Sequence, residues 1–190
     1  MSSNRYIALL RGVNAGRAKR VAMADLCKLI DSLGFADVRS VLNSGNLVFA
    51  GPPLACAELA GTIEESLVLK LGVAARVIVL ASDELATIID ENPLLAVASD
   101  PTRLLAFVLS DPAMRELVAP LCRQDWEGEQ LAVGARAAYV WCPQGVQGSA
   151  AALALGKQLG DATTSRNWST MLRLHALCAQ APPLRPVQFR

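Results

Sequence analysis

Val38-Arg39-Ser40-Val41-Leu42-Asn43-Ser44-Gly45-Asn46-Leu47-Val48-Phe49 places two short apolar segments on either side of four turn-forming residues. Asn and Gly tolerate the positive φ angles of tight turns, so this pattern predicts a β-hairpin. The apolar run Tyr6–Arg11 predicts an earlier strand. Apolar residues at helical spacing from Met23 to Leu33 predict a helix between that strand and the hairpin.

The chain after the hairpin completes a known supersecondary unit. Pro52 and Pro53 open a segment whose apolar spacing predicts a helix to about Leu71, and Val73–Leu80 has the β-branched composition of a strand. The order strand, helix, strand, strand, helix, strand is that of a ferredoxin-like βαββαβ unit. We expect Ser82 to cap a short helix that follows this unit.

The same order of elements recurs in the second half. The elements predicted there are a strand at Arg103–Leu109, a helix at Pro112–Cys122, a hairpin of Gln130–Val133 and Ala137–Cys142, a helix at Ser149–Leu159, a short strand near Ala162–Thr164 and a helix at Trp168–Ala179. The sequence therefore predicts an α+β fold with two tandem ferredoxin-like (βαββαβ) halves and an extra C-terminal helix. The expected boundaries are 1–81 for half one, 82–102 for a helix and connector, 103–180 for half two with the C-terminal helix, and 181–190 for an extended tail.

The first strand of each half is apolar on both faces. In Tyr6–Arg11, one face carries Ile7 and Leu9, and the other carries Tyr6, Ala8 and Leu10. Residues 103–109 show the same apolar pattern on both faces. A ferredoxin-like sheet carries helices on one face only, so the other face also needs a cover. We expect the halves to pack against each other or the chain to form a homodimer. An RNA-binding sheet with exposed stacking aromatics is disfavoured, since Phe49 stands nearly alone.

The composition narrows the class of protein. Of the 190 residues 53% are hydrophobic and 18% are charged, which excludes an intrinsically disordered chain. No apolar run reaches the roughly 18 residues of a membrane span, and no signal-peptide core is visible, so we expect a cytoplasmic protein without membrane contact. The five cysteines form no C-x-x-C pair and His175 is the single histidine, so we predict no metal site and no cofactor.

Polar residues gather where the predicted strands of half one end. In a βαββαβ unit, the segment from Arg11 through Asn14 lies beside the turn that contains Asn43, Ser44 and Asn46. Arg17–Arg20 leads from this edge into a helix N-terminus, which favours anions. The glycine spacing matches neither a P-loop nor a dinucleotide-binding motif. The alternative is that the glycines and asparagines serve turns and that the basic loop is merely solvated.

A second polar cluster, at 163–170, precedes the last predicted helix. Asn167 or Ser165 is a natural N-cap, Trp168 would pack at the helix start, and Arg166 could hold a carboxylate or phosphate or pair with a structural acid. His175 is interpreted as a packed residue rather than a base. The chain has no G-x-S-x-G motif and no metal-binding histidine set.

Several of these segments resemble one bacterial family of uncharacterised proteins, the domain of unknown function 1697 family. The matching residues are Tyr6–Gly16, Val21–Met23 with Leu26, Leu33–Val38, Asn43–Phe49 and Thr164–Thr170 with Leu174. The resemblance implies a two-part ferredoxin-like α+β fold and brings no activity. This chain departs from the family pattern at Arg17, where a glycine is frequent. It also departs at Gly145–Ala151, which lacks a lysine.

Three hypotheses about function remain open. The first is a ligand-binding protein that recognises an anionic or nucleotide-like small molecule; nucleic acid is a weaker variant of this idea. The second is an enzyme that acts on a phosphorylated or carboxylate metabolite in a groove at the same polar edge, with Ser44, Asn46 or Arg166 as positioning groups. The third is a protein-interaction scaffold. The predicted ligand-binding residues are Arg11, Asn14, Lys19, Asn43, Ser44, Asn46, Arg166, Asn167 and Trp168.

Overall fold

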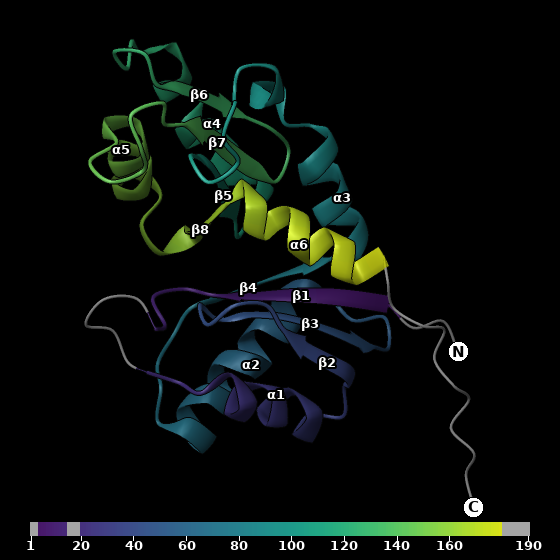
Figure 1. Ribbon diagram of the computed structural model, residues 1–190. Helices are drawn as coiled ribbons and strands as arrows, with labels where there is room; N and C mark the ends of the chain where they lie inside the picture. Colours follow the sequence, from purple (N-terminus) through teal and green to yellow (C-terminus); the bar gives the residue numbers. More distant parts are fainter. Residues whose placement is uncertain (1–3, 15–19, 180–190) are drawn as a thin grey trace, which may run out of the picture.

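Two antiparallel sheets of four strands each form the frame of the protein (Figure 1). The structure is a computed structural model, and it describes residues 4–14 and 20–179. In the first sheet the strand order is β2-β3-β1-β4, and in the second it is β6-β7-β5-β8. The strands are β1 (Asn4–Leu10), β2 (Ala36–Ser40), β3 (Asn46–Gly51), β4 (Val77–Ala81), β5 (Leu104–Leu109), β6 (Gln130–Val133), β7 (Ala137–Trp141) and β8 (Thr163–Asn167).

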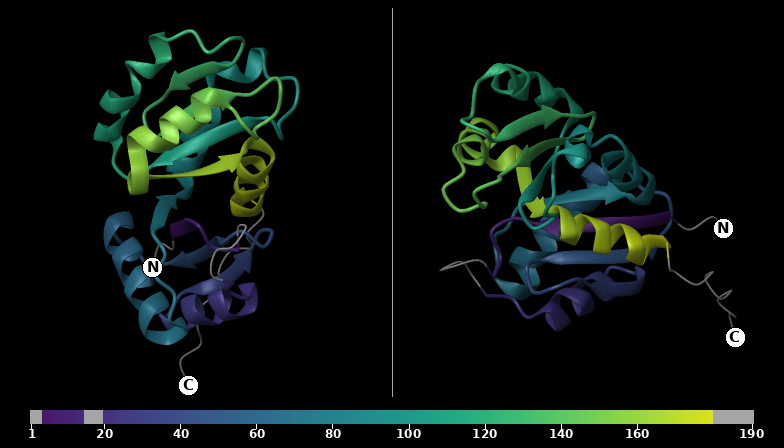
Figure 2. Two further views of the ribbon diagram at one scale, coloured as in Figure 1. Left: turned by 90° about the vertical axis from the view of Figure 1, so that its left-hand side faces the viewer. Right: turned by 45° about the horizontal axis from the view of Figure 1, so that its top comes forward.

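Helices cover both outer faces and also fill the space between the sheets. Helices α1 (Met23–Ser32) and α2 (Cys56–Leu71) pack on the outer face of the first sheet, and α4 (Arg115–Val118) and α5 (Ala150–Leu159) pack on the outer face of the second. Between the sheets lie α3 (Ser82–Asp90) and α6 (Trp168–Ala179), which contact each other (Figures 1 and 2). Each half therefore ends with a helix that enters the shared layer.

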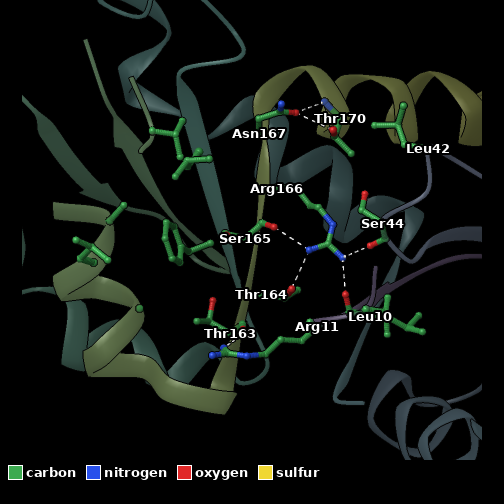
Figure 3. A pocket seen from close by; sticks show the side chains of 18 residues that line it. Leu10, Arg11, Leu42, Ser44, Thr163, Thr164, Ser165, Arg166, Asn167 and Thr170 are labelled. Carbon is green, nitrogen blue, oxygen red and sulfur yellow. Dashed lines mark hydrogen bonds between the residues drawn. The ribbon is translucent and has the colours of Figure 1, made fainter. Parts of the chain in front are cut away.

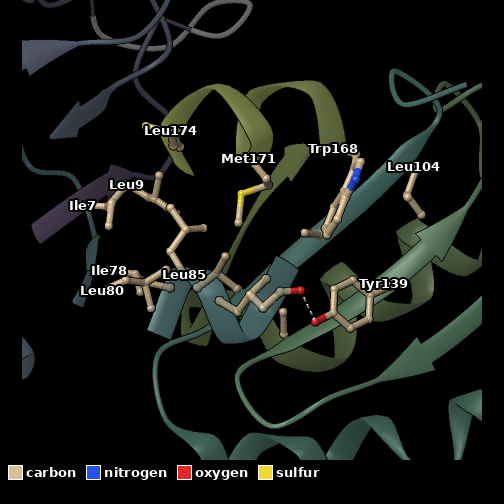
Figure 4. Packing of buried hydrophobic residues seen from close by; sticks show 14 of the residues in the cluster. Ile7, Leu9, Ile78, Leu80, Leu85, Leu104, Tyr139, Trp168, Met171 and Leu174 are labelled. Atoms are coloured by element: carbon tan, nitrogen blue, oxygen red, sulfur yellow. Dashed lines mark hydrogen bonds between the residues drawn. The ribbon is translucent and has the colours of Figure 1, made fainter. Parts of the chain in front are cut away.

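The shared layer is a hydrophobic core of its own (Figure 4). Ile7 and Leu9 of β1 point into it, while the alternating residues of β1 point to α1 and α2. From the other side Tyr139 packs on Trp168, and the buried Tyr139 hydroxyl donates a hydrogen bond of 2.8 Å to the carbonyl oxygen of Ile88. The two-sided strands thus find their second cover within the chain, as the first of the two alternatives predicted.

The hairpin of half one forms where its sequence predicts it. Gly45 has a φ of +72°, and a Cβ there would lie 2.5 Å from Cγ2 of Val13, so the turn approaches the β1 loop too closely for any side chain. The backbone N–H of Leu10 donates to the Gly45 carbonyl at 2.8 Å. The end of β1 and the hairpin turn are therefore neighbours, as expected. Leu42, with a φ of 58°, is a left-handed residue that the turn pattern did not predict.

Some element boundaries differ from those predicted. The helix expected at Pro112–Cys122 is broken into the 3₁₀ turn Pro112–Met114, α4 and the 3₁₀ turn Leu121–Arg123. The break follows from Pro120, which lacks a backbone donor and cannot continue a helix. Strand β4 starts at Val77 rather than Val73, and β8 extends further than predicted, to Asn167.

The cap of α3 also differs from the prediction. Ser82 is the first residue of this helix rather than its cap. The carboxylate of Glu84 accepts the backbone N–H of Ala81 at 3.0 Å instead.

In the part of the chain that the structure describes, no helix combines the length and the apolarity needed to cross a membrane.

Candidate functional site

A cavity of about 620 Å³ lies where the two halves meet (Figure 3). We call it the β8 cavity because it opens beside the outer edge of β8. The end of β1 and the hairpin turn contribute from half one, and β5, β8 and α5 contribute from half two. Its described lining residues are Leu10, Arg11, Gly12, Val13, Leu42, Ser44, Leu105, Phe107, Val146, Ala152, Leu153, Gly156, Thr163, Thr164, Ser165, Arg166, Asn167 and Thr170.

Strand β8 is an edge strand, and two arginines bind its outer edge. The Ser110 N–H donates to the Ala162 carbonyl at 2.9 Å, so by antiparallel alternation the N–H and C=O groups of Thr163 and Ser165 face away from β5. Nη1 of Arg11 donates to the Thr163 carbonyl at 2.6 Å. Nη1 of Arg166 donates to the Ser165 carbonyl at 2.7 Å. The outward carbonyls are thus capped, while the outward N–H groups face the cavity side.

Arg166 joins the two halves. Its five N–H donors meet five protein acceptors. Three acceptors belong to half one: the Asn46 side-chain oxygen, the Leu10 carbonyl at 2.7 Å and the Ser44 carbonyl at 3.3 Å. The other two are the Thr164 hydroxyl and the Ser165 carbonyl of β8 itself. Arg166 therefore fixes how the hairpin turn sits against β8.

The charge of Arg166 is compensated by dipoles and not by an acid. Burial lowers the pKa of its guanidinium to about 10, so the side chain is still cationic at neutral pH. None of its five acceptors is a carboxylate, and no ion pair of Arg166 is formed among residues 4–14 and 20–179. A cation of this kind makes the cavity electropositive.

Arg11 retains donors for a ligand. Its Nη1 donates to the carbonyls of Gly160 and Thr163, and its Nε lies 3.6 Å from Oδ1 of Asp161, an acid that is 75% exposed. Nη2 forms no hydrogen bond with the described residues. Arg11 therefore sits at the cavity with a fixed position and an unused face, as an anion-binding arginine requires.

Two of the asparagines predicted as ligand contacts, Asn14 and Asn46, form hydrogen bonds that hold the loops together. Nδ2 of Asn14 donates to the carbonyls of Val21 and Asn43, each at 2.8 Å, and its Oδ1 accepts the Val21 N–H. The buried Asn46 holds the Val41 carbonyl and the Ser44 hydroxyl and accepts from Arg166. Of the predicted turn residues, Ser44 lines the β8 cavity, whereas Asn43 and Asn14 line a separate cavity of about 460 Å³.

The cluster at the start of α6 is divided between cap, core and cavity. Asn167 is the N-cap, because its Oδ1 accepts the Thr170 N–H at 3.0 Å, and it also lines the cavity. Trp168 is 4% exposed and belongs to the core between the sheets, away from the cavity lining. Lys19 lies outside the described residues, as does the tail at 181–190.

The sequence did not single out the apolar half of the cavity. Leu105 and Phe107 reach it from β5, and Val146 and Leu153 reach it from the α5 side. These residues look like ordinary core or surface positions until the halves are docked. The sequence feature that could have indicated the site is the polar composition of β8, Thr163-Thr164-Ser165-Arg166-Asn167. Half one has the apolar strand β4 at the corresponding position.

A second cavity, of about 530 Å³, lies at the corresponding place beside β4. We call it the β4 cavity. It holds two arginines and two acids, and each arginine has its own acid. Arg76 lies 3.2 Å from Glu64, and Nε of Arg136 lies 3.0 Å from Glu84 in an ion pair without hydrogen-bond alignment.

The described residues provide little basis for binding a metal ion or for reacting through a thiolate. No group of three or more His, Cys, Asp or Glu there could hold a metal ion. The five cysteines form no disulfide, and burial raises the pKa of the Cys142 and Cys178 thiols, so they are poor thiolates. His175 is half-buried on α6 and lies outside the cavity lining.

A family model described as "Protein of unknown function (DUF1697)" matches residues 3–139, which is most of the chain. The chain belongs to this family. The match confirms the resemblance drawn from the β1 and hairpin segments. It ends before β8, so Arg166 lies beyond the matched residues of this DUF1697 protein.

Among solved structures, the conserved bacterial protein SP0830 from Streptococcus pneumoniae is similar to this DUF1697 protein. The similarity has a TM-score of 0.73 and 19% sequence identity, and it covers 93% of this chain and 99% of that chain. At this identity the similarity shows a shared fold. A search of curated proteins finds no match.

Proposed function

We propose that this protein binds an anionic small molecule in the β8 cavity. The observation that carries the proposal is the charge of the described lining, which contains Arg11 and Arg166 and no acidic residue. Cavities of some 300–1,000 Å³ are the usual size for small-molecule sites, and 620 Å³ lies within that range. An anion there would pair with Arg11, whose own acid Asp161 is 75% exposed, and would also be attracted by the buried charge of Arg166.

Binding is favoured over catalysis by the chemistry of the same lining. Apart from the arginines, the described lining residues carry hydroxyl, amide or apolar side chains, none of which titrates near neutral pH. A general base would have to come from the ligand or from residues outside that set. We therefore rank the enzymatic alternative second.

The decisive experiment removes the charge of Arg11 and leaves its shape nearly intact. We expect Arg11→Gln to weaken the binding of an anionic probe by about tenfold or more, because a charged hydrogen bond contributes about 1.5–3 kcal/mol. Isothermal titration calorimetry with octanoate, inorganic phosphate and ATP at 50 and 200 mM salt would measure the loss.

Arg76→Gln is the matched control, since Arg76 is an arginine of the β4 cavity that already has an acid. We expect its probe affinity to equal that of the unmodified protein. Absence of binding by every anionic probe, or equal affinity in Arg11→Gln and the unmodified protein, would refute the proposed function.

We also infer that the fold is a tandem duplication of a ferredoxin-like unit with an added helix. The support is the strand order, which places the four strands of each half in the same sequence, and the helix that follows the last strand of each half. The registers agree as well, because Val77 pairs with Leu10 as Thr163 pairs with Leu109. On this view α6 is the counterpart of α3 and not an extra element.

A further inference from the structure

Apolar side chains form a large part of the β8 cavity lining. Phe107 and Leu105 project from the face of β5 that packs toward α5. Leu42, Val146 and Leu153 stand around the opening and are 50%, 38% and 68% exposed. Three of the ten exposed large apolar residues of the described chain therefore gather at one cavity. Such a concentration of exposed apolar surface is typical of a binding site.

The polar part of the β8 cavity offers few charged donors to a ligand. All five donors of Arg166 are used by the protein, so this side chain supplies charge without hydrogen bonds to a ligand. Among the described lining residues, the donors without a hydrogen bond include Nη2 of Arg11, the outward N–H groups of Thr163 and Ser165, the Ser165 hydroxyl and Nδ2 of Asn167. Only Nη2 of Arg11 is charged, so this set suits a single carboxylate-sized head group. A triphosphate would require more positive charge.

A peptide strand is a poor occupant of this edge. Strand addition requires free N–H and C=O groups along the edge of the sheet. Here the outward carbonyls of Thr163 and Ser165 already accept from Arg11 and Arg166. An added strand would find donors and no acceptors at these positions.

We propose that the ligand is an organic acid with a single anionic head group and an apolar body. This inference rests on the proposed anion site. The head group binds Arg11 and the Ser165 N–H at the edge of β8, next to the charge of Arg166. The apolar body lies along Phe107 and contacts Val146 and Leu153 at the opening.

The test is a chain-length series of straight-chain carboxylates, measured by titration calorimetry against the intact protein. Affinity is expected to rise about fourfold for each methylene that becomes buried, and octanoate is expected to bind at least about 50-fold more tightly than butyrate. Octanol, which keeps the body and lacks the charge, is expected to bind at least about tenfold more weakly than octanoate.

The Leu153→Ser variant distinguishes the contribution of the ligand's apolar body to binding from that of its head group. This substitution is expected to weaken the binding of octanoate about three- to tenfold and to leave the affinity for butyrate unchanged. Leu69→Ser is the matched control, since Leu69 is 76% exposed on α2 and lies outside the cavity lining. Arg11→Gln is expected to weaken both acids.

The outcomes separate this inference from the proposed function. If ATP or inorganic phosphate binds as tightly as octanoate at a site that Arg11→Gln destroys, the proposed function stands and the present inference fails. If octanoate binds equally well to the unmodified protein, Leu153→Ser and Arg11→Gln, the acid binds elsewhere and the inference fails. If no anion binds at all, both fail together.

Discussion

The cavities beside β4 and β8 are built from corresponding parts. Each has an edge strand, the helix that precedes this strand, and the hairpin turn of the opposite half. They are also similar in volume, about 530 and 620 Å³. Their charges differ. The β4 cavity pairs two arginines with two acids, whereas the described lining of the β8 cavity has two arginines and no acid.

Two positions account for much of this difference. Arg166 in β8 corresponds to Leu80 in β4, because Arg166 pairs with Ala106 as Leu80 pairs with Ile7. Arg11, directly after β1, corresponds to Ser110, directly after β5. One frame therefore yields a neutral cavity or an electropositive one according to the side chains at these places. The charge, and not the hollow itself, distinguishes the candidate site.

The largest effect is expected from the Arg166 position. Arg166→Met removes five donors and leaves buried acceptors such as Oδ1 of Asn46 without a partner, so we expect a loss of about 3 kcal/mol or more in the free energy of unfolding. Urea denaturation measures this loss. Leu80→Met, the same final residue at the corresponding position, should cost less than about 1.5 kcal/mol. Equal losses in the two variants would show that Arg166 is not a clamp.

An intermediate effect is expected from removing an acid of the β4 cavity. Glu84→Gln leaves Arg136 without its carboxylate and weakens the bond to the Ala81 N–H, which should cost about 1–3 kcal/mol of stability. Burial and the Glu84 carboxylate raise the pKa of the Cys56 thiol to about 11. Loss of the negative charge should lower that pKa and increase the thiolate fraction at pH 9.5.

The Cys56 effect can be measured as the rate of alkylation by iodoacetamide, followed on the peptide that contains Cys56. Faster alkylation is expected in Glu84→Gln. Glu65→Gln, at an exposed position one residue after Glu64 on α2, is the control and should leave the rate unchanged. A rate in Glu84→Gln equal to that of the control would mean that this carboxylate does not hold the thiol protonated.

The smallest effect is expected from Asp161, which forms an ion pair with Arg11. Asp161→Asn should make the β8 cavity more positive and increase octanoate affinity by no more than about threefold, because exposed ion pairs are weak. The gain should fade between 50 and 200 mM salt. Asp90→Asn gives the same charge change on α3 and should have no effect; a similar gain there would indicate a general charge effect.

The order of elements was predictable because it depends on local patterns. The hairpin at Asn43–Asn46, the two-sided apolarity of β1 and the helix start at Trp168 could all be read from neighbouring residues. The break of the predicted helix at Pro112–Cys122 could also have been read from Pro120. The α3 cap could not, because Glu84 replaces the expected serine by reaching back to the backbone.

The site was less predictable because it depends on docking. Arg11 and Arg166 were both identified as anion-binding candidates, but they lie 155 positions apart in the sequence and meet through the packing of the halves. Asn14 and Asn46 were predicted as ligand contacts because of their amide groups, but these groups form hydrogen bonds with backbone carbonyls of the loops. Phe107 and Leu153 carry no chemical signature, so they become visible only as walls of a cavity.

The bonds of Arg166 also make the cavity a property of the assembled chain. Three of its acceptors belong to one half and two to the other, so neither half contains the site when separated. Ligand binding is therefore thermodynamically linked to the docking of the two halves. The ligand raises the equilibrium constant for docking by the same factor by which docking raises the affinity for the ligand. Substitutions far from the cavity that loosen the layer of α3 and α6 would then register as weaker binding. The ligand affinity of this protein would then measure how stably its two halves are docked.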